Sequence, residues 1–396
     1  MVLLYLGIIL LAGLLFGRLA KLIKLPNVTG YLVAGLLLGP YVLKIIPSDI
    51  VNNFSLVSEV SLAFIAFTIG LSFKRSYFKR VGLTPVVIAI FEALIAVFAV
   101  QGVLIATGQD LAFSIVLGAI AAATAPAATI MVIKQYKAQG PLTETLLSVV
   151  AIDDAVALIA FSFAVTIAKA ISGTGATSNI ALSIIKPFGE VFLALAIGAV
   201  SGLIIKLPLK YFKKSGNRLI IACGFIFITA AVCDLLGLSS LLACMTLGAV
   251  FCNVSDESDL VADIVDKVTP PIFLMFFVIS GAELNINVIP SIGIVGILYV
   301  VVRVIGKMLG AFLGAKIMRA PKSVCRWLGP TLIPQAGVAI GLTLVAQEVV
   351  PEFAPTIRAV ILCGTMIYEI FGPVITKISL VKAGEIKVEK SKKLTK

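Results

Sequence analysis

Apolar runs long enough to cross a lipid bilayer recur from one end of this chain to the other. A membrane-spanning helix needs about 20 predominantly apolar residues. Of the 396 residues, 60% are hydrophobic and only 13% are charged, and the mean hydropathy is +1.13. This composition excludes a water-soluble domain and is typical of a polytopic helical membrane protein. The alternation of polar and apolar residues that marks a transmembrane β-barrel is not found in the sequence.

The apolar runs predict an all-α polytopic membrane protein with about thirteen transmembrane helices. Their expected limits are 2–17, 26–43, 55–73, 84–107, 111–133, 145–170, 188–208, 218–237, 239–253, 268–284, 289–316, 328–348 and 354–379. A transmembrane domain is therefore expected over residues 1–380, followed by a basic tail over residues 381–396.

Lys and Arg are concentrated in alternate loops, after the first, third, fifth, seventh and eleventh expected spans. Because such residues are retained on the cytoplasmic side, the pattern predicts an outside N-terminus and a cytoplasmic C-terminus in the inner cell membrane. One loop placed in the cytoplasm is instead acidic, but acidic residues carry little weight in this rule. Its acids are Asp256, Glu257, Asp259, Asp263 and Asp266. The net charge of +12 is thus a topology signal, and no nucleic-acid partner is expected.

Two expected spans contain a proline near their middle. The fifth has Pro126 within residues 124–129, and the twelfth has Pro334 followed by Gln335. A proline removes a helical hydrogen bond, and the freed backbone groups need partners inside the membrane. Either proline alone is equally typical of an ordinary kinked helix. Because the two spans are an odd number of spans apart, they run in opposite directions, which predicts inverted-topology repeats with two crossed broken helices.

Two adjacent carboxylates, Asp153 and Asp154, lie inside the apolar run at residues 146–168. An acid at the centre of a membrane helix costs about 2.5–3.5 kcal/mol on insertion scales and usually marks a functional site. On an α-helix the two side chains point roughly 100° apart, so they need different partners. The structural alternative is a buried pair satisfied by neighbouring polar groups.

The eleventh expected span offers two cations, Arg303 and Lys307, which are four residues apart and share a helix face. Lys307 is a candidate proton switch, because a cation that binds its carboxylate partner would free the lysine to lose its proton. Arg303 is expected to form a structural ion pair. Glu92 and Glu369 are secondary candidates, either as direct ion sites or as partners of Arg303 or of a helix end. Gln335, in the second interruption, is a further secondary candidate.

The sequence contains no histidine, and its six cysteines form no C-x-x-C pair. No imidazole is therefore available as a metal ligand or pH sensor, and the cysteines are interpreted as reduced, small apolar residues. No resident cofactor is expected. The only metal ion expected is a transported one, bound by Asp154 and Asp153.

Several segments resemble motifs of the monovalent cation/proton antiporter superfamily, of the sodium/proton exchanger type. They are LPNVTGYLVAGLLLGP at residues 25–40, AFTIGL at 66–71, LGLS at 236–239 and FFVISG at 276–281. Asp153-Asp154 matches the double aspartate of the electrogenic branch, whereas the electroneutral branch usually has Asn-Asp. The resemblance extends over nearly all of the chain to about residue 380.

The resemblance implies secondary active, electrogenic exchange of Na⁺ or Li⁺ for H⁺ by elevator-like alternating access. It implies that Asp154 is the main cation and proton carboxylate and that Asp153 pairs with Lys307. It also implies that Thr124 and Thr129, in the first interruption, help to coordinate the ion.

The resemblance further implies a homodimer in a lipid bilayer, with monovalent cations and protons as the transported partners. Its expected parts are a dimerisation scaffold at residues 1–73 and 218–284, a transport core at 84–170 and 289–379, and a linker helix at 188–208. Many members carry an acid or serine before the first breakpoint proline. This chain has Ala125 there, so no side-chain role is expected at that position.

Three other functions are alternatives to sodium/proton exchange. Potassium/proton exchange on the same scaffold stays open, because nothing in the sequence fixes the ion. An organic-anion/sodium symporter can share crossed broken helices, but the paired acids favour a cation site. An intramembrane aspartyl protease needs its two aspartates on different helices, which adjacent residues do not provide, so the chain is not expected to be an enzyme.

Overall fold

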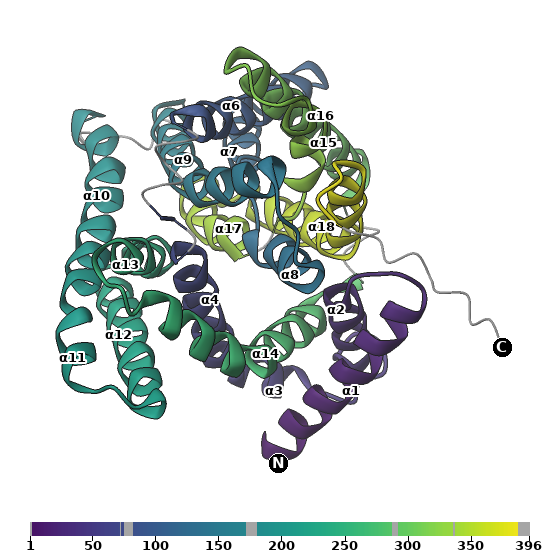
Figure 1. Cartoon of the computed structure of the whole chain (residues 1–396). Helices are drawn as coiled ribbons and strands as arrows, with labels where there is room; N and C mark the ends of the chain where they lie inside the picture. The colour runs from purple at the N-terminus through teal and green to yellow at the C-terminus, as the bar shows by residue number, and fades with distance from the viewer. Residues whose placement is uncertain are drawn as a thin grey trace.

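The computed structural model describes residues 2–71, 73–74, 82–171, 180–286, 292–335 and 337–386. Within these ranges every regular element is a helix (Figure 1). The helices are α1 Val2–Leu22, α2 Asn27–Leu38, α3 Ser48–Asn53, α4 Ser55–Gly70, α6 Thr84–Ala106, α7 Leu111–Ile120, α8 Pro126–Tyr136, α9 Pro141–Ile171, α10 Ile180–Ile204, α11 Lys206–Tyr211, α12 Ser215–Leu235, α13 Ser240–Val254, α14 Ser258–Glu283, α15 Gly293–Ile317, α16 Lys322–Thr331, α17 Gly337–Val349 and α18 Ala354–Lys382.

The predicted all-α membrane fold is confirmed. Among the described residues, nine helical segments are long and apolar enough to cross a membrane. Two of them join neighbouring helices, α3 with α4 and α10 with α11. The shorter apolar helices α2 and α13 match two further expected spans. The fifth and twelfth expected spans are each divided into two half-helices, α7 with α8 and α16 with α17. Residues 387–396 of the expected basic tail lie outside the described residues.

Helices α10, α14 and α16 begin at least six residues earlier than the sequence predicted, and α10 starts at Ile180 and not at residue 188. Helix α14 starts at Ser258 and not at residue 268, and α16 starts at Lys322 and not at residue 328. The first turns of both helices carry charged side chains. Hydropathy recognises only the apolar part of such a helix, so the predicted limits missed the charged turns.

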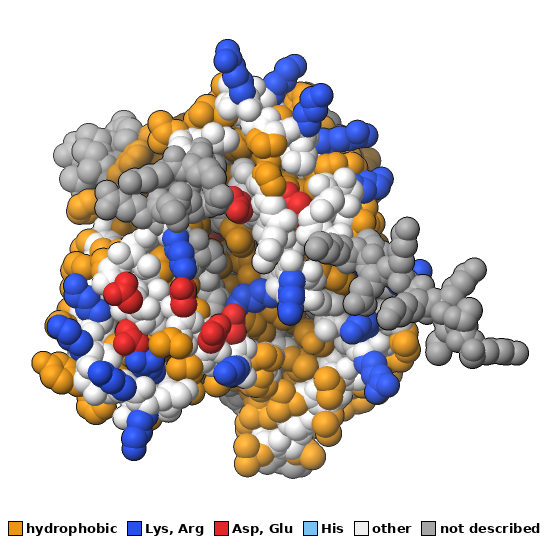
Figure 2. Space-filling model, in the orientation of Figure 1, with side chains coloured by type: hydrophobic (Ala, Val, Ile, Leu, Met, Phe, Trp, Pro, Cys, Tyr) orange, Lys and Arg blue, Asp and Glu red, His pale blue; other side chains and the backbone are white. Residues whose placement is uncertain are grey.

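The acidic segment that the topology prediction placed beside basic loops forms ion pairs with basic residues. The pairs are Lys74 with Asp259 (2.8 Å), Lys134 with Asp266 (2.7 Å) and Arg218 with Glu257. The hydrogen bond to Asp259 raises the pKa of the Lys74 ammonium. Figure 2 shows acidic side chains gathered over α12 and α14 with Lys and Arg around them. An exposed pair such as Lys74–Asp259 contributes only about 0–1 kcal/mol, so it indicates placement more than stability.

The helix contacts repeat in matched pairs, as an inverted-topology repeat requires. Helix α7 packs against α6 and α9, and α16 packs against α15 and α18. Likewise α2 packs on α14, and α13 packs on α4. Each of these last two contacts brings a glycine of each helix against the partner's backbone: Gly35 and Gly281 in the first, Gly70 and Gly248 in the second. Small residues allow membrane helices to approach closely.

The helices form two groups in Figure 1. A bundle of α6, α7, α8, α9, α15, α16, α17 and α18 lies in the upper right, and the remaining helices form an arc along its left and lower sides. Within the bundle, α6 packs along α15. Gly306 and Gly310 of α15 lie against the backbone of Ala96 and Glu92 of α6. This close approach places Lys307, which lies between the two glycines, beside α6.

The N-terminus of α9 is capped by Glu385, which lies just beyond α18. Its carboxylate accepts hydrogen bonds from the Leu142 N–H at 2.6 Å and from the Thr143 N–H at 2.7 Å. The first N–H groups of a helix lack intrahelical partners, and a carboxylate there also interacts favourably with the helix dipole. Glu385 therefore ties the end of the second repeat to the helix that carries Asp153 and Asp154.

Replacing Glu385 with glutamine should destabilise this junction. The change removes the charge and replaces one acceptor oxygen by a donor, so we expect the free energy of unfolding to fall by about 1–2 kcal/mol. Thermal unfolding of the purified protein in detergent measures this. Glu352→Gln, at an exposed position between α17 and α18, is the matched control and should leave Tm unchanged. An equal Tm for Glu385→Gln and the native chain would contradict the capping role.

Candidate functional site

The two broken helices cross at their unwound segments. Residues 121–125 separate α7 from α8, and residues 332–336 separate α16 from α17, with Ala336 outside the described residues. The Ala125 N–H donates to the Pro334 carbonyl at 2.8 Å, so the two segments are in direct contact. The predicted pair of crossed broken helices is confirmed.

Arg303 of α15 satisfies carbonyls from both unwound segments. Its Nε donates to the Ala121 carbonyl at 3.1 Å and its Nη2 to the Ala123 carbonyl at 2.7 Å. Its Nη1 donates to the Ile333 carbonyl at 2.8 Å. The expected ion pair of Arg303 is not found among the described residues, so that part of the prediction was wrong. The guanidinium also stacks on Tyr368, 4.6 Å from the ring centroid.

Gln335 forms further hydrogen bonds at the crossing. Its Nε2 donates to the Ile120 carbonyl at 3.0 Å, and the Tyr299 hydroxyl donates to its Oε1 at 3.2 Å. Sequence reasoning missed Tyr299, although a signal was present: it lies four residues before Arg303, on the same face of α15. It also missed Tyr368, whose hydroxyl donates to a carbonyl of α15.

Lys307 joins the crossing to the acids. Its Nζ donates to the Ala122 carbonyl at 2.5 Å, to Thr124 Oγ1 at 2.6 Å and to Asp153 Oδ2 at 3.4 Å. It also lies 2.8 Å from Glu92 Oε2, an ion contact that lacks hydrogen-bond alignment. The structure thus brings Lys307, Asp153 and Thr124 together. Glu92, expected as an ion site or as a partner of Arg303 or of a helix end, is instead a second partner of Lys307.

Asp154 forms no ion pair with Lys307, whose described carboxylate partners are Glu92 and Asp153. Asp154 is 6% exposed, and its Oδ1 has no hydrogen-bond partner in the part of the chain that the structure describes. It borders a cavity of about 310 Å³ that is also lined by Leu242 and Val338. The two aspartates therefore have different surroundings, as their spacing on one helix predicted.

The buried charges at the crossing do not balance. The acids are Glu92, Asp153 and Asp154, and the bases are Arg303 and Lys307; none is more than 6% exposed. With every group ionised, this set carries one net negative charge. Binding of one proton or one monovalent cation would neutralise it.

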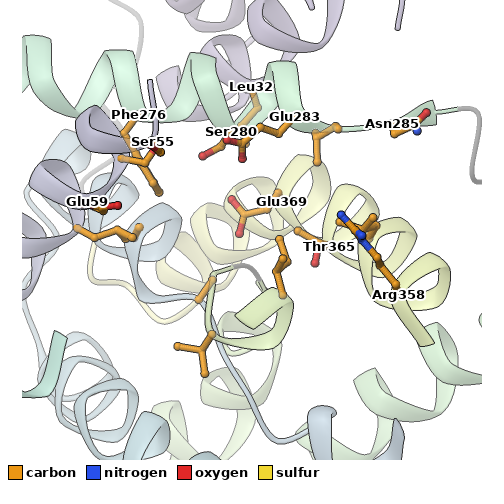
Figure 3. Close-up of a pocket in the computed structure, with 18 of the residues that line it drawn as sticks. Leu32, Ser55, Glu59, Phe276, Ser280, Glu283, Asn285, Arg358, Thr365 and Glu369 are labelled. Atoms are coloured by element: carbon orange, nitrogen blue, oxygen red, sulfur yellow. The ribbon is translucent and has the colours of Figure 1, made fainter. Parts of the chain in front are cut away.

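The remaining candidates lie elsewhere. The Thr129 hydroxyl donates to the Thr331 carbonyl at 3.3 Å and so links the half-helices α8 and α16. Glu369 of α18 lines a separate cavity of about 1240 Å³ (Figure 3). The lining of this cavity also includes Thr124 and Ala125. Over the described residues, no group of three or more acidic or cysteine side chains has the geometry of a metal site.

The sequence profile of the family described as "Sodium/hydrogen exchanger, transmembrane" matches residues 6–382. This chain belongs to that family. It is therefore a membrane-embedded cation/proton antiporter and not an enzyme. The matched region includes both broken helices and every buried charge of the crossing.

Two relatives and one solved structure show the range of similarity. A Na⁺/H⁺ antiporter of Enterococcus hirae is 23% identical over 354 residues, covering 86% of this chain and 88% of that protein. The ammonium/H⁺ antiporter subunit AmhT of Alkalihalophilus pseudofirmus is 22% identical over 382 residues, covering 93% and 92%. The sodium proton antiporter MjNhaP1 of Methanocaldococcus jannaschii shares the fold, with a TM-score of 0.70, 21% identity and coverage of 97% and 96%.

Replacing Arg303 with lysine should destabilise the crossing although the charge is kept. An ammonium cannot reproduce the planar fork that reaches carbonyls of two segments. Each buried acceptor left without a donor costs about 1–3 kcal/mol. We therefore expect a lower Tm in detergent, together with reduced exchange in proteoliposomes. Arg358→Lys, at an exposed position on α18, is the control. A native Tm for Arg303→Lys would show that these three hydrogen bonds are dispensable.

Proposed function

We propose that this antiporter exchanges Na⁺, or Li⁺, for H⁺ at a site formed by Asp154 and the Asp153–Lys307 pair. The observation that carries the proposal is the excess of one acid among the buried charges at the crossing. An unpaired buried carboxylate is costly, so the site is expected to hold a proton or a cation before it crosses the membrane. Competition of the two for one place is the physical basis of coupled exchange.

Asp154 is the proposed primary carboxylate. It has an oxygen without a partner among the described residues, and it borders a cavity of about 310 Å³. Asp153 is held by Lys307, so it becomes available only when the ammonium moves away. In this scheme the cation binds first to Asp154 and recruits Asp153 by displacing the lysine.

The main-chain carbonyls freed by the breaks are already engaged. Those of residues 121–123 and Ile333 accept hydrogen bonds from Arg303 or Lys307. We therefore assign the cation to the carboxylate oxygens of the two aspartates, with the Thr124 hydroxyl joining once the lysine has left it. Thr129 would coordinate the ion only after releasing the Thr331 carbonyl. The scheme requires no resident cofactor.

Exchange is proposed to be electrogenic. One proton leaves Asp154 when the cation binds, and a second leaves Lys307 after its displacement, so two protons exchange for one cation. In this scheme the buried set is neutral when it carries the protons and has one net negative charge when it carries the cation, so each cycle moves one charge across the membrane. A lysine that kept its proton would remain beside Glu92, and exchange would then be one for one. Solid-supported-membrane currents, compared with the cation flux, distinguish these two schemes.

We propose an elevator-like motion of the bundle against the arc of helices. The bundle would be the transport core, and the scaffold would comprise α1, α2, α3, α4, α12, α13 and α14, with α10 as linker. The cavity of about 1240 Å³ supports this division, because helices of both groups line it. It would admit ions to the crossing from one side of the membrane.

Away from the large cavity, polar contacts join the bundle to the scaffold helices. The Asn27 N–H donates to Gln135 Oε1 at 2.8 Å, and Gln135 Nε2 donates to Asn27 Oδ1 at 3.2 Å. Lys134 pairs with Asp266 nearby. Asn27 begins α2, whereas Leu32, further along the same helix, faces the cavity. The distribution of basic residues assigns the end with these contacts to the cytoplasm.

By the same assignment the N-terminus is outside, the C-terminus is cytoplasmic and the large cavity opens outward. We place the protein in the inner cell membrane as a homodimer formed through the scaffold helices. The dimer rests on the resemblance of the sequence to the superfamily.

Potassium/proton exchange is the second candidate. The relatives carry names that include both sodium and ammonium, so ion choice is not fixed by the shared fold. The same flux assay with K⁺ in place of Na⁺ separates the two candidates. The organic-anion symporter is disfavoured by the excess acid at the crossing, which would repel an anion.

Asp154→Asn should abolish exchange. The amide keeps the shape of the side chain but can neither release a proton nor neutralise a cation. Proton flux driven by a Na⁺ gradient in proteoliposomes measures this, and Glu352→Gln is the matched control for removal of an exposed acid. Near-native flux through Asp154→Asn would refute the assignment.

Joining α2 to α8 should stop transport if the bundle moves. In an Asn27→Cys/Gln135→Cys chain, a short bifunctional thiol reagent with a reducible centre should block exchange, and reduction should restore it. The controls are each single variant and the native chain, whose six cysteines are free, all treated with the reagent. Full exchange by the cross-linked chain would exclude relative movement of these two helices.

A further inference from the structure

The larger cavity is bounded by both groups of helices. Its volume is about 1240 Å³. One wall comes from α2, α4 and α14, and the other comes from α8, α17 and α18 (Figure 3). Thr124 and Ala125, at the first helix break, also line it. An ion within the cavity therefore has access to the crossing.

Two buried polar side chains of α18 face this cavity without partners. Glu369 is 5% exposed, and Thr365, one turn earlier, is 3% exposed. Neither Glu369 Oε1 nor the Thr365 hydroxyl has a hydrogen-bond partner among the residues for which coordinates are described. Figure 3 shows both on one side of the cavity, with Ser280 and Glu283 of α14 across from them.

The two buried bases of the crossing, Arg303 and Lys307, do not neutralise Glu369. The Arg303 guanidinium is engaged with three carbonyls and with the ring of Tyr368, the neighbour of Glu369 in sequence. Lys307 is engaged by Asp153 and Glu92. Buried carboxylates are normally paired or hydrogen-bonded, so this one lacks the usual structural explanation.

The charge of the cavity lining favours cations. Among its described residues, the acids Glu59, Glu283 and Glu369 outnumber the single base, Arg358. A recess lined mostly by one sign of charge, with low-dielectric walls, concentrates ions of the opposite sign. Carboxylate and hydroxyl oxygens are also the ligands that hard cations prefer.

We infer that Glu369 and Thr365 form a second cation-binding site, separate from the aspartate pair and on the path to it. The Glu369 carboxylate supplies the charge, and the Thr365 hydroxyl supplies a neutral oxygen ligand. Because α18 belongs to the same bundle as α9, this site moves together with Asp154. The inference rests on proposed cation/proton exchange, but it does not depend on the roles assigned to Asp153, Asp154 or Lys307.

Binding of radiolabelled Na⁺ to the purified protein tests this site without transport. In Asp154→Asn, Na⁺ binding should persist as one component of weaker affinity. Adding Glu369→Gln to that chain should remove the remaining component. In the otherwise native chain, Thr365→Val should weaken the second component about tenfold, because it deletes one oxygen ligand while keeping the side-chain shape.

Control variants distinguish Na⁺ binding at Glu369 from general attraction of Na⁺ by the acids that line the cavity. Glu283→Gln removes one charge from the opposite wall at an exposed position and should leave the second component in place. Each variant is first compared with the native chain by Tm and elution volume, and Glu369→Asp should retain binding if the fold is intact. Loss of the component in Glu283→Gln to the same extent as in Glu369→Gln would overturn the site.

Two other results would also overturn it. One is a single Na⁺ component that Asp154→Asn removes entirely; the other is unchanged binding after Glu369→Gln. Failure of the proposed function looks different, because Asp154→Asn would then keep native exchange whatever happens to the second binding component.

Discussion

Backbone carbonyls released by two broken helices must be satisfied inside a membrane, and the rest of this structure depends on how that is done. In hydrocarbon an unpaired peptide group costs several kcal/mol, so unwound backbone persists only with partners. Here the donors come from one face of α15, through Arg303 and Lys307, to four carbonyls of both segments. The glycine face of α15 that packs on α6 brings these cations to the crossing. Positive charge is thus built into the centre of the bundle, and at Arg303 it is permanent.

The positive charge of Arg303 and Lys307 lowers the cost of burying carboxylates beside them. A carboxylate buried in a membrane is costly alone and far less costly beside a cation. Asp153 and Glu92 both contact Lys307, whereas Asp154 does not. The crossing therefore contains acids with a fixed partner and one acid without a partner among the described residues. Only the acid without a partner is stabilised by binding a proton or a cation, which is why the exchange role is proposed for Asp154. Arg303, whose three guanidinium nitrogens each donate to a carbonyl, is left with a structural role.

Features encoded in local sequence could be predicted, and features set by packing could not. Pro126 and Pro334 predicted both breaks because they lie in two spans an odd number of spans apart. A proline alone is not sufficient, since Pro270 and Pro271 lie inside the continuous helix α14. The charged first turns of α14 and α16 were not predicted, because hydropathy identifies only the apolar part of a helix and not its full length. The partner of Arg303 was missed for a different reason. A guanidinium can satisfy either carboxylates or carbonyls, and only the three-dimensional path of the unwound backbone decides between them.

The position of Glu92 follows from the packing of α6 on α15. It matters for how cation binding is coupled to proton release in the proposed scheme. Hydropathy placed it in mid-membrane but could not tell which face of α15 it meets. In the structure, Gly310 of α15 lies against the Glu92 backbone, and the side chain reaches the Lys307 ammonium. The lysine therefore has two carboxylates within reach, so a cation that takes Asp153 from it does not leave an isolated ammonium. Whether Lys307 then releases its proton depends on how strongly Glu92, Thr124 and the Ala122 carbonyl hold its charged form. In the proposed scheme, the stoichiometry of exchange therefore depends on Glu92 of α6 as well as on the paired aspartates.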